Sequence, residues 1–181
     1  MKFITTPLLG VYVIKFEPFL DERGSFTRTF CQKEFTQIGF HKQIVQINHS
    51  INRQKGTIRG MHYQQPPACE TKIIRCVLGK VFDVMVDLRA GSPTFKKWYG
   101  VELSKENMHM VLIPEGFAHG FQTLTDNAEL IYLSSEFYNP KYERGLRFDD
   151  PTVAISWPLH VDVISPKDQN WSFMDNNFKG I

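Results

Sequence analysis

The sequence lacks any long apolar run, and it shows almost no helical periodicity over its 181 residues. A membrane-spanning helix needs about 20 consecutive apolar residues, so this absence argues against a membrane protein. The opening stretch MKFITTPLLGVYVIKF lacks the long hydrophobic centre of a secretory signal and is soon interrupted by Lys15 and Glu17. We interpret this stretch as a first strand, and we expect a soluble protein of the cytoplasm.

The sequence also has few cysteines and a net charge close to zero. The three cysteines Cys31, Cys69 and Cys76 form no CxxC or other metal-binding spacing, and an odd, sparse count predicts free thiols in a reducing compartment. The net charge is only +2 and Lys and Arg form no long block, which argues against nucleic-acid binding but allows a local phosphate site. The length and even composition predict a single domain over residues 1–181.

The dominant pattern is a succession of short apolar or alternating segments separated by Gly, Pro, Asn and Ser, which is typical of β-strands. The predicted strands are Val11–Phe16, Ser25–Phe30, Gln43–Asn48, Thr57–Tyr63, Lys72–Leu78, Lys80–Leu88, Trp98–Leu103, Met108–Ile113, His119–Leu124 and Glu129–Ser134. The best helical pattern is Gln32–Ile38, which Gly39 follows as a stop signal. After Ser135 the turn-rich sequence predicts an irregular C-terminal segment. Many short strands and little helix favour an all-β fold, either a sandwich or a barrel.

The segment KVFDVMVDLR shows the strand alternation most clearly. One of its faces is purely apolar, and the other carries Asp83 and Asp87 beside Val and Met. Two acids on one strand face usually mean that the face meets water, but in a barrel they can point into a polar cavity. Both interpretations are open at this point.

Two histidine-containing segments, GTIRGMHYQ and IPEGFAHGFQTL, carry the first candidates for chemistry. The second contains a PxGxxH pattern that ends at His119 and fits the jelly rolls of the cupin type. In the first, the position two residues after His62 is Gln64, an amide and a poorer metal ligand than imidazole. We therefore predict no metal and no cofactor, with a metal-dependent cupin enzyme as the remoter alternative. His62 and His119 are then candidate bases or hydrogen-bond donors, and Arg59 and Lys72 indicate an anionic ligand.

A series of longer motifs extends this pattern through nearly the whole chain, from Asp21 to Asp168. They are DERGSF, QINHS, RGMHYQ, ETKIIRC, VFDVMVDLRAGSPTFKKW, IPEGFAHGFQTL, IYLSSEFYNP, ISWPLH and SPKD. By these motifs the chain resembles the dTDP-4-dehydrorhamnose 3,5-epimerase family. The resemblance implies a cupin-type jelly-roll barrel that forms a homodimer with exchanged N-terminal strands. It also implies a metal-free active site that epimerises a nucleotide-linked 4-keto-6-deoxy sugar.

The resemblance further implies roles for particular residues. His62 matches the base that removes a proton beside the ketone, and Asp168 matches its carboxylate partner. Tyr132 matches the acid on the opposite face of the sugar, and Lys72 matches a cation near the enolate oxygen. The implied substrate-binding positions are Arg23, Phe26, Gln46, Asn48, Arg59, His119, Tyr138, Glu143 and Lys167. Among these, Tyr138 is expected to stack on the base, and Arg23 and Phe26 to reach the nucleotide of the neighbouring subunit.

One position departs from the family pattern. The stretch RGSFTRTF has Arg28 where the family carries a glutamate that contacts the nucleotide. A five-donor cation cannot make the contact of an acceptor-only carboxylate, so Arg28, still a substrate-binding candidate, reaches phosphate, contacts a different base or points away. We expect conversion of dTDP-4-dehydro-6-deoxyglucose to dTDP-4-dehydrorhamnose. The alternatives are a CDP- or GDP-linked 4-keto sugar, inversion of C3 or C5 alone, and a non-catalytic sugar-binding jelly roll.

Overall fold

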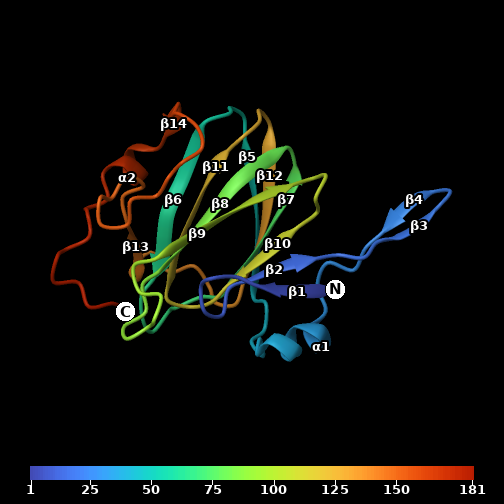
Figure 1. Ribbon diagram of the computed structural model, residues 1–181, viewed down its shortest axis with the longest axis horizontal. Helices are drawn as coiled ribbons and strands as arrows, with labels where there is room; N and C mark the ends of the chain where they lie inside the picture. The colour runs from blue at the N-terminus through green and yellow to red at the C-terminus, as the bar shows by residue number, and fades with distance from the viewer.

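Two antiparallel sheets face each other in the computed structural model, which describes all residues from 1 to 181 (Figure 1). Sheet I contains, in spatial order, β1 (Lys2–Thr5), β2 (Tyr12–Lys15), β10 (Met110–Ile113), β7 (Lys72–Leu78), β12 (Ala128–Ser134) and β5 (Gln46–Asn52). Sheet II contains β13 (Glu143–Gly145), β6 (Thr57–Gln64), β11 (Phe117–Thr123), β8 (Lys80–Asp87) and β9 (Trp98–Ser104). The short β14 (Val163–Ile164) lies parallel to β6.

Three small features lie outside the two sheets. The hairpin of β3 (Phe19–Asp21) and β4 (Gly24–Phe26), which we call the arm, projects away from the barrel (Figure 1). The predicted helix Gln32–Ile38 is confirmed as α1 (Gln32–Phe35) and the 3-10 helix η1 (Thr36–Ile38), which ends at Gly39. The third feature is α2 (Pro166–Gln169), near the C-terminus. None of the helices is long and apolar enough to cross a membrane.

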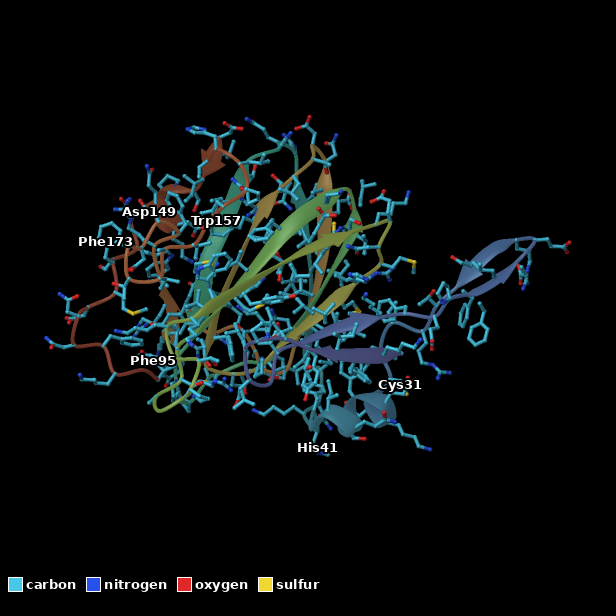
Figure 2. All side chains as sticks on the ribbon, in the orientation of Figure 1. Cys31, His41, Phe95, Asp149, Trp157 and Phe173 are labelled. Atoms are coloured by element: carbon cyan, nitrogen blue, oxygen red, sulfur yellow. The ribbon has the colours of Figure 1, made fainter.

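Buried side chains fill three layers of the molecule. Between the sheets, Met85, Phe121 and Ile74 are almost completely buried, and each such side chain stabilises the fold by about 2 kcal/mol. The outer face of sheet II is covered by the C-terminal segment, where Trp157 packs on Phe82 of β8 (Figure 2). The outer face of sheet I packs against α1 in the same way. The expected all-β, cupin-type jelly roll with few short helices and an irregular C-terminal segment is thus confirmed.

Several predicted strand boundaries need correction. The strand predicted over Ser25–Phe30 ends at Phe26, because Phe30 turns back to pack on Phe35 of α1 with ring centroids 4.8 Å apart. The strand predicted over Gln43–Asn48 is shifted and forms β5. The single first strand is in fact two, β1 and β2, which pair with each other. The sequence predictions missed β3, β13 and β14, each of which has only two or three residues.

The two acids of β8 do not face water. Asp83 and Asp87 are both completely buried, so the exposed interpretation of this strand face is wrong. Asp83 bonds to His119, a cavity residue described below. Asp87 instead accepts hydrogen bonds from Arg89 and from two hydroxyl groups in the turn after β8. The polar-cavity interpretation therefore holds for Asp83, whereas Asp87 organises a turn.

Candidate active site

A cavity of about 590 Å³ opens between the two sheets. It is lined by Gln46, Asn48, His62, Tyr63, Gln64, Glu70, Lys72, Tyr132, Ser134, Tyr138 and Glu143. A second space of about 330 Å³ shares three of these residues and adds Arg59, His119, Phe121, Ser165, Lys167 and Asp168. Because the shared residues are His62, Lys72 and Tyr132, these three groups lie at the centre of one continuous polar site.

His62 on β6 is paired with Asp168 on α2. Its Nε2 lies 2.6 Å from the Asp168 Oδ1, and the second carboxylate oxygen accepts the Gly60 backbone N–H at 3.1 Å. The N-cap residue Ser165 fixes the Asp168 backbone by accepting its N–H. Burial raises the pKa of Asp168, but the bonds from His62 and Gly60 outweigh that and leave it below its ordinary value. Asp168 is thus an ionised acceptor, so the His62 Nε2 carries the proton and Nδ1 is free to accept one.

Lys72 on β7 is held beside the backbone of His62. Its ammonium donates to the His62 carbonyl at 3.4 Å and pairs with Glu70 at 3.2 Å. Only 15 % of the Lys72 side chain and 12 % of the Glu70 side chain are exposed, so the pair is largely shielded from solvent. A shielded cation that already has a fixed position can stabilise a developing negative charge with little reorganisation.

Tyr132 approaches the cavity from sheet I, opposite His62 on sheet II. Its ring packs on His119 and Phe121, with centroids 6.1 and 6.5 Å away. Burial, aided by the negative charge of Asp83, raises the pKa of the Tyr132 phenol well above its ordinary value. The phenol therefore keeps its proton until a strongly basic atom is placed beside it.

His119 and Arg59 line the second space, where His119 is buried and Arg59 is exposed, and both have buried polar partners. His119 Nε2 lies 2.8 Å from the Asp83 Oδ1, and burial raises the pKa of that carboxyl. The Arg59 Nε donates to the Asn52 Oδ1 at 2.6 Å, and Asn52 is itself 2 % exposed. A guanidinium oriented in this way can present its remaining donors to a phosphate.

At the rim of the cavity, Glu143 of β13 links two other elements. Its carboxylate accepts from the Tyr138 hydroxyl at 2.7 Å and from the Lys167 ammonium at 2.6 Å. On the other side of the cavity, Gln46 and Asn48 project from β5 and bond to each other. The Gln46 amide oxygen also accepts the Tyr138 backbone N–H at 3.1 Å.

Gln64 has a structural task. Its amide nitrogen donates to the carbonyls of Ala68 and Phe137, and its oxygen accepts the Asn139 N–H. These three bonds fix the loop that carries Tyr138 and leave the amide no role as a ligand. No cluster of three or more His, Cys, Asp or Glu side chains in the structure has the arrangement of a metal site.

The arm residues are not brought to this cavity within the chain. Phe26 is 71 % exposed, and Arg23 bonds only to Asp21 of the same hairpin. Arg28, just after the arm, donates to Glu34 of α1 at 3.3 Å. The remaining predicted site residues come together around one cavity, whereas Arg23, Phe26 and Arg28 do not join them.

Sequence reasoning missed several residues that support the site. Glu70, Asp83, Asn52 and Ser165 each hold a predicted site residue in place. Asp83 had a usable signal, as an acid on an otherwise apolar strand face, and Ser165 had one as an N-cap residue before Pro166. Glu70 and Asn52 lie close in sequence to their partners Lys72 and Arg59, but nothing in that spacing marks them as partners.

The fold and the site together define a jelly-roll protein whose cavity is equipped for acid–base chemistry on an anionic ligand. The family model described as dTDP-4-dehydrorhamnose 3,5-epimerase matches residues 5–176, and the chain belongs to this family. A relative with that name from Shigella flexneri is 45 % identical over 98 % of this chain and 99 % of its own length.

Two solved structures with this name resemble the chain closely. The structure from Elizabethkingia anophelis superposes with a TM-score of 0.94 at 38 % identity, over 98 % of both chains. The structure from Bacillus anthracis, which has TDP and PPi bound, superposes with a TM-score of 0.92 at 38 % identity, over 96 % of this chain and 99 % of that one. A relative from Streptomyces niveus is named a 3-epimerase and is 40 % identical over 89 % of this chain and 78 % of its own length.

Proposed function

We propose that this protein inverts C3 and C5 of dTDP-4-dehydro-6-deoxyglucose to give dTDP-4-dehydrorhamnose. The observation that carries the proposal is the 2.6 Å pair of His62 and Asp168, which faces the same cavity as Lys72 and Tyr132. A base, a cation and an acid on facing sheets are the groups that epimerisation beside a ketone requires. Family membership supports the same reaction.

In the first step, the His62 Nδ1 takes the proton from the carbon beside the ketone. The electron pair of the broken C–H bond moves into the ring, and the ketone oxygen becomes an enolate. His62 is now an imidazolium, and the ionised Asp168 stabilises the new charge through Nε2. Lys72, which already lies beside the His62 carbonyl, supplies positive charge to the enolate oxygen.

In the second step, the Tyr132 phenol delivers its proton to the same carbon from the opposite face. The carbonyl re-forms and the carbon is inverted. Tyr132 and His62 come from facing sheets, which supports their placement on opposite faces of the sugar ring. The carbon of an enolate is basic enough to take the proton even from a phenol with a raised pKa. Proton exchange with solvent resets both groups before the second carbon reacts.

The nucleotide part of the substrate is assigned to the remaining candidates. We assign Arg59 and His119 to the sugar or the diphosphate and Lys167, with Glu143, to the sugar-nucleotide, while Tyr138 at the cavity wall stacks on the base. Tyr138 must first give up its bond to Glu143. Gln46 and Asn48 bond to the ligand from β5.

A homodimer with exchanged N-terminal strands completes this proposal. The arm has only two short strands, and its Phe19 and Phe26 are 75 % and 71 % exposed. An isolated hairpin is marginally stable in water, so we expect a second copy to cover it and to receive Arg23 and Phe26 at its own cavity. The Arg28–Glu34 pair supports the interpretation that Arg28 points away from the nucleotide. Family membership supports thymidine as the base. The free cysteines support a cytoplasmic location.

The test is deuterium exchange from D₂O into dTDP-, CDP- and GDP-linked 4-keto-6-deoxyglucose. We expect the dTDP sugar to gain deuterium at C3 and C5 and to yield the inverted product. Exchange at C3 alone would instead assign a 3-epimerase like the Streptomyces niveus relative. Faster exchange into the CDP or GDP sugar would contradict the choice of thymidine.

A further inference from the structure

Trp171 lies beside the His62–Asp168 pair and belongs to none of the groups assigned above. Its indole packs edge-on to the His62 ring, with centroids 6.4 Å apart and planes at 69°. The Lys167 ammonium lies 5.8 Å from the same indole. Trp171 follows α2 by only two residues, so a single side chain connects the segment that carries Asp168 to the imidazole.

The indole rests on Gly145, the residue of β13 that pairs directly with His62 of β6. A Cβ atom at Gly145 would overlap with three atoms of the indole ring. The backbone of Gly145 does not have a positive φ, so a side chain is excluded here by space rather than by conformation. Trp171 thus fills the cross-strand position next to His62 that a side chain at residue 145 would otherwise take.

α2 needs such an anchor because it has only four residues. A single helical turn is not stable without tertiary contacts. On its N-terminal side the turn is held by β14, which pairs with β6, by the Ser165 cap and by the Asp168 bonds to Gly60 and His62. The Lys167–Glu143 pair adds a contact at the cavity rim. The Trp171 indole is the large apolar group that seats the C-terminal end of this turn on the sheet.

We propose that Trp171, seated on Gly145, is a positioning residue that holds Asp168 and the His62 ring in line for proton removal. The inference rests on the proposed function, because it takes His62 as the base. Without the indole, α2 shifts on β6 and water reaches the His62–Asp168 bond. Substrate binding by Gln46, Asn48 and Tyr138 on the opposite wall of the cavity is unaffected, whereas Lys167 moves with α2. The fall in kcat is therefore expected to be much larger than the rise in KM.

The experiment is a double-mutant cycle on Trp171 and Gly145, measured as kcat and KM with the dTDP 4-keto sugar. Trp171→Leu is expected to lower kcat about 30-fold, since small misplacements of catalytic groups have effects of this order. KM should rise only about threefold, because Lys167 moves with α2 while the other binding residues stay in place. Trp171→Phe, which keeps a ring, should recover kcat to within about threefold of the wild type.

Gly145→Ala tests the steric contact. In the wild-type background, Gly145→Ala should lower kcat about as much as Trp171→Leu does. In the Trp171→Leu background it should have little further effect, because both changes remove the same contact. Trp157→Leu is the matched control: Trp157 packs on Phe82 and donates to the Phe148 carbonyl, away from the pair. It should lower the melting temperature and leave kcat unchanged.

Unchanged kcat in folded Trp171→Leu, a change confined to KM, or equal effects of Gly145→Ala in both backgrounds would each overturn the inference. Melting temperatures, followed by circular dichroism, separate loss of folding from loss of positioning. If Trp171→Leu does not fold, the comparison of Trp171→Phe with Gly145→Ala decides, since only the second displaces the indole. Failure of the proposed function looks different, because the wild type itself then exchanges no deuterium into the sugar.

Discussion

The barrel cavity and the arm differ in how their functional side chains are held. In the cavity, His62, Lys72 and Arg59 each have a buried or shielded partner on a neighbouring element. On the arm, Phe26 is exposed and Arg23 bonds only within its own hairpin. A single chain therefore fixes the acid–base groups by itself, whereas Arg23 and Phe26 have no partner outside their own hairpin.

The largest effect is expected from removing the charge that orients the cavity base. Asp168→Asn keeps the shape of the side chain but cannot stabilise the His62 imidazolium, so kcat should fall about 1,000-fold with little change in KM. Steady-state kinetics measure both constants. Asp149→Asn, which alters an exposed pair with Arg147, is the control and should have no effect. A loss below tenfold would show that the cavity does not depend on this partner.

A slightly smaller effect is expected from the acid on the facing sheet. Tyr132→Phe removes the proton donor but leaves His62 and Asp168 in place, so inverted product should form about 100-fold more slowly. Deuterium exchange should continue, because His62 can return a deuteron to the face from which it took the proton. NMR of the sugar follows both processes in one sample. Normal inversion in this variant would place the acid elsewhere.

A moderate effect, confined to binding, is expected on the arm. Phe26→Ala should raise KM about tenfold and change kcat less than about twofold, as for an aromatic contact that binds ground state and transition state alike. The folded barrel should keep its melting temperature, since Phe26 makes no core contact. Phe173→Ala removes another exposed phenylalanine, at 49 % exposure, and serves as control. Equal KM values for the two variants would contradict a role of the arm in binding.

The smallest effect on activity is expected at Asp87, which separates folding from chemistry. Burial raises its pKa, but bonds from Arg89, Ser92 and Thr94 outweigh that and lower the pKa to about 2. The folded pKa lies below the unfolded one, so the ionised Asp87 carboxylate contributes about 2 kcal/mol to the free energy of unfolding above pH 4. This contribution disappears as the pH falls toward 2. Asp87→Asn should therefore weaken unfolding stability at neutral pH and flatten its acid dependence, with kcat unchanged. Denaturant titrations from pH 2 to 7 check this.

The sequence predicted the central strands because short apolar or alternating segments are separated there by turn-forming residues. β6, β7, β8 and β12 lie within a residue or so of their predicted bounds. The prediction was less accurate where long-range contacts decide the structure. β4 ends earlier than predicted because Phe30 packs on Phe35 of α1, and no feature of the sequence near Phe30 indicates this contact.

For the site, the residue pattern without the family resemblance indicated only two histidines, His62 and His119, near the cations Arg59 and Lys72. The pairing of His62 with Asp168 joins positions 106 residues apart, so the expectation came from family resemblance and not from spacing. The place of Trp171 on Gly145 could not be predicted either, because a glycine in a short strand carries no sign of what occupies its missing side chain. The alternation of apolar residues in a strand indicates which face of the strand is buried. It does not indicate which residue elsewhere in the chain packs against that face.

Deuterium exchange with His62→Ala tests the central claim most directly. The account predicts that wild-type protein in D₂O labels C3 and C5 of the dTDP 4-keto sugar and that His62→Ala labels neither carbon. The variant should still bind dTDP, since the remaining cavity groups are unchanged. Normal labelling by His62→Ala would contradict the account, because another group would then be the base.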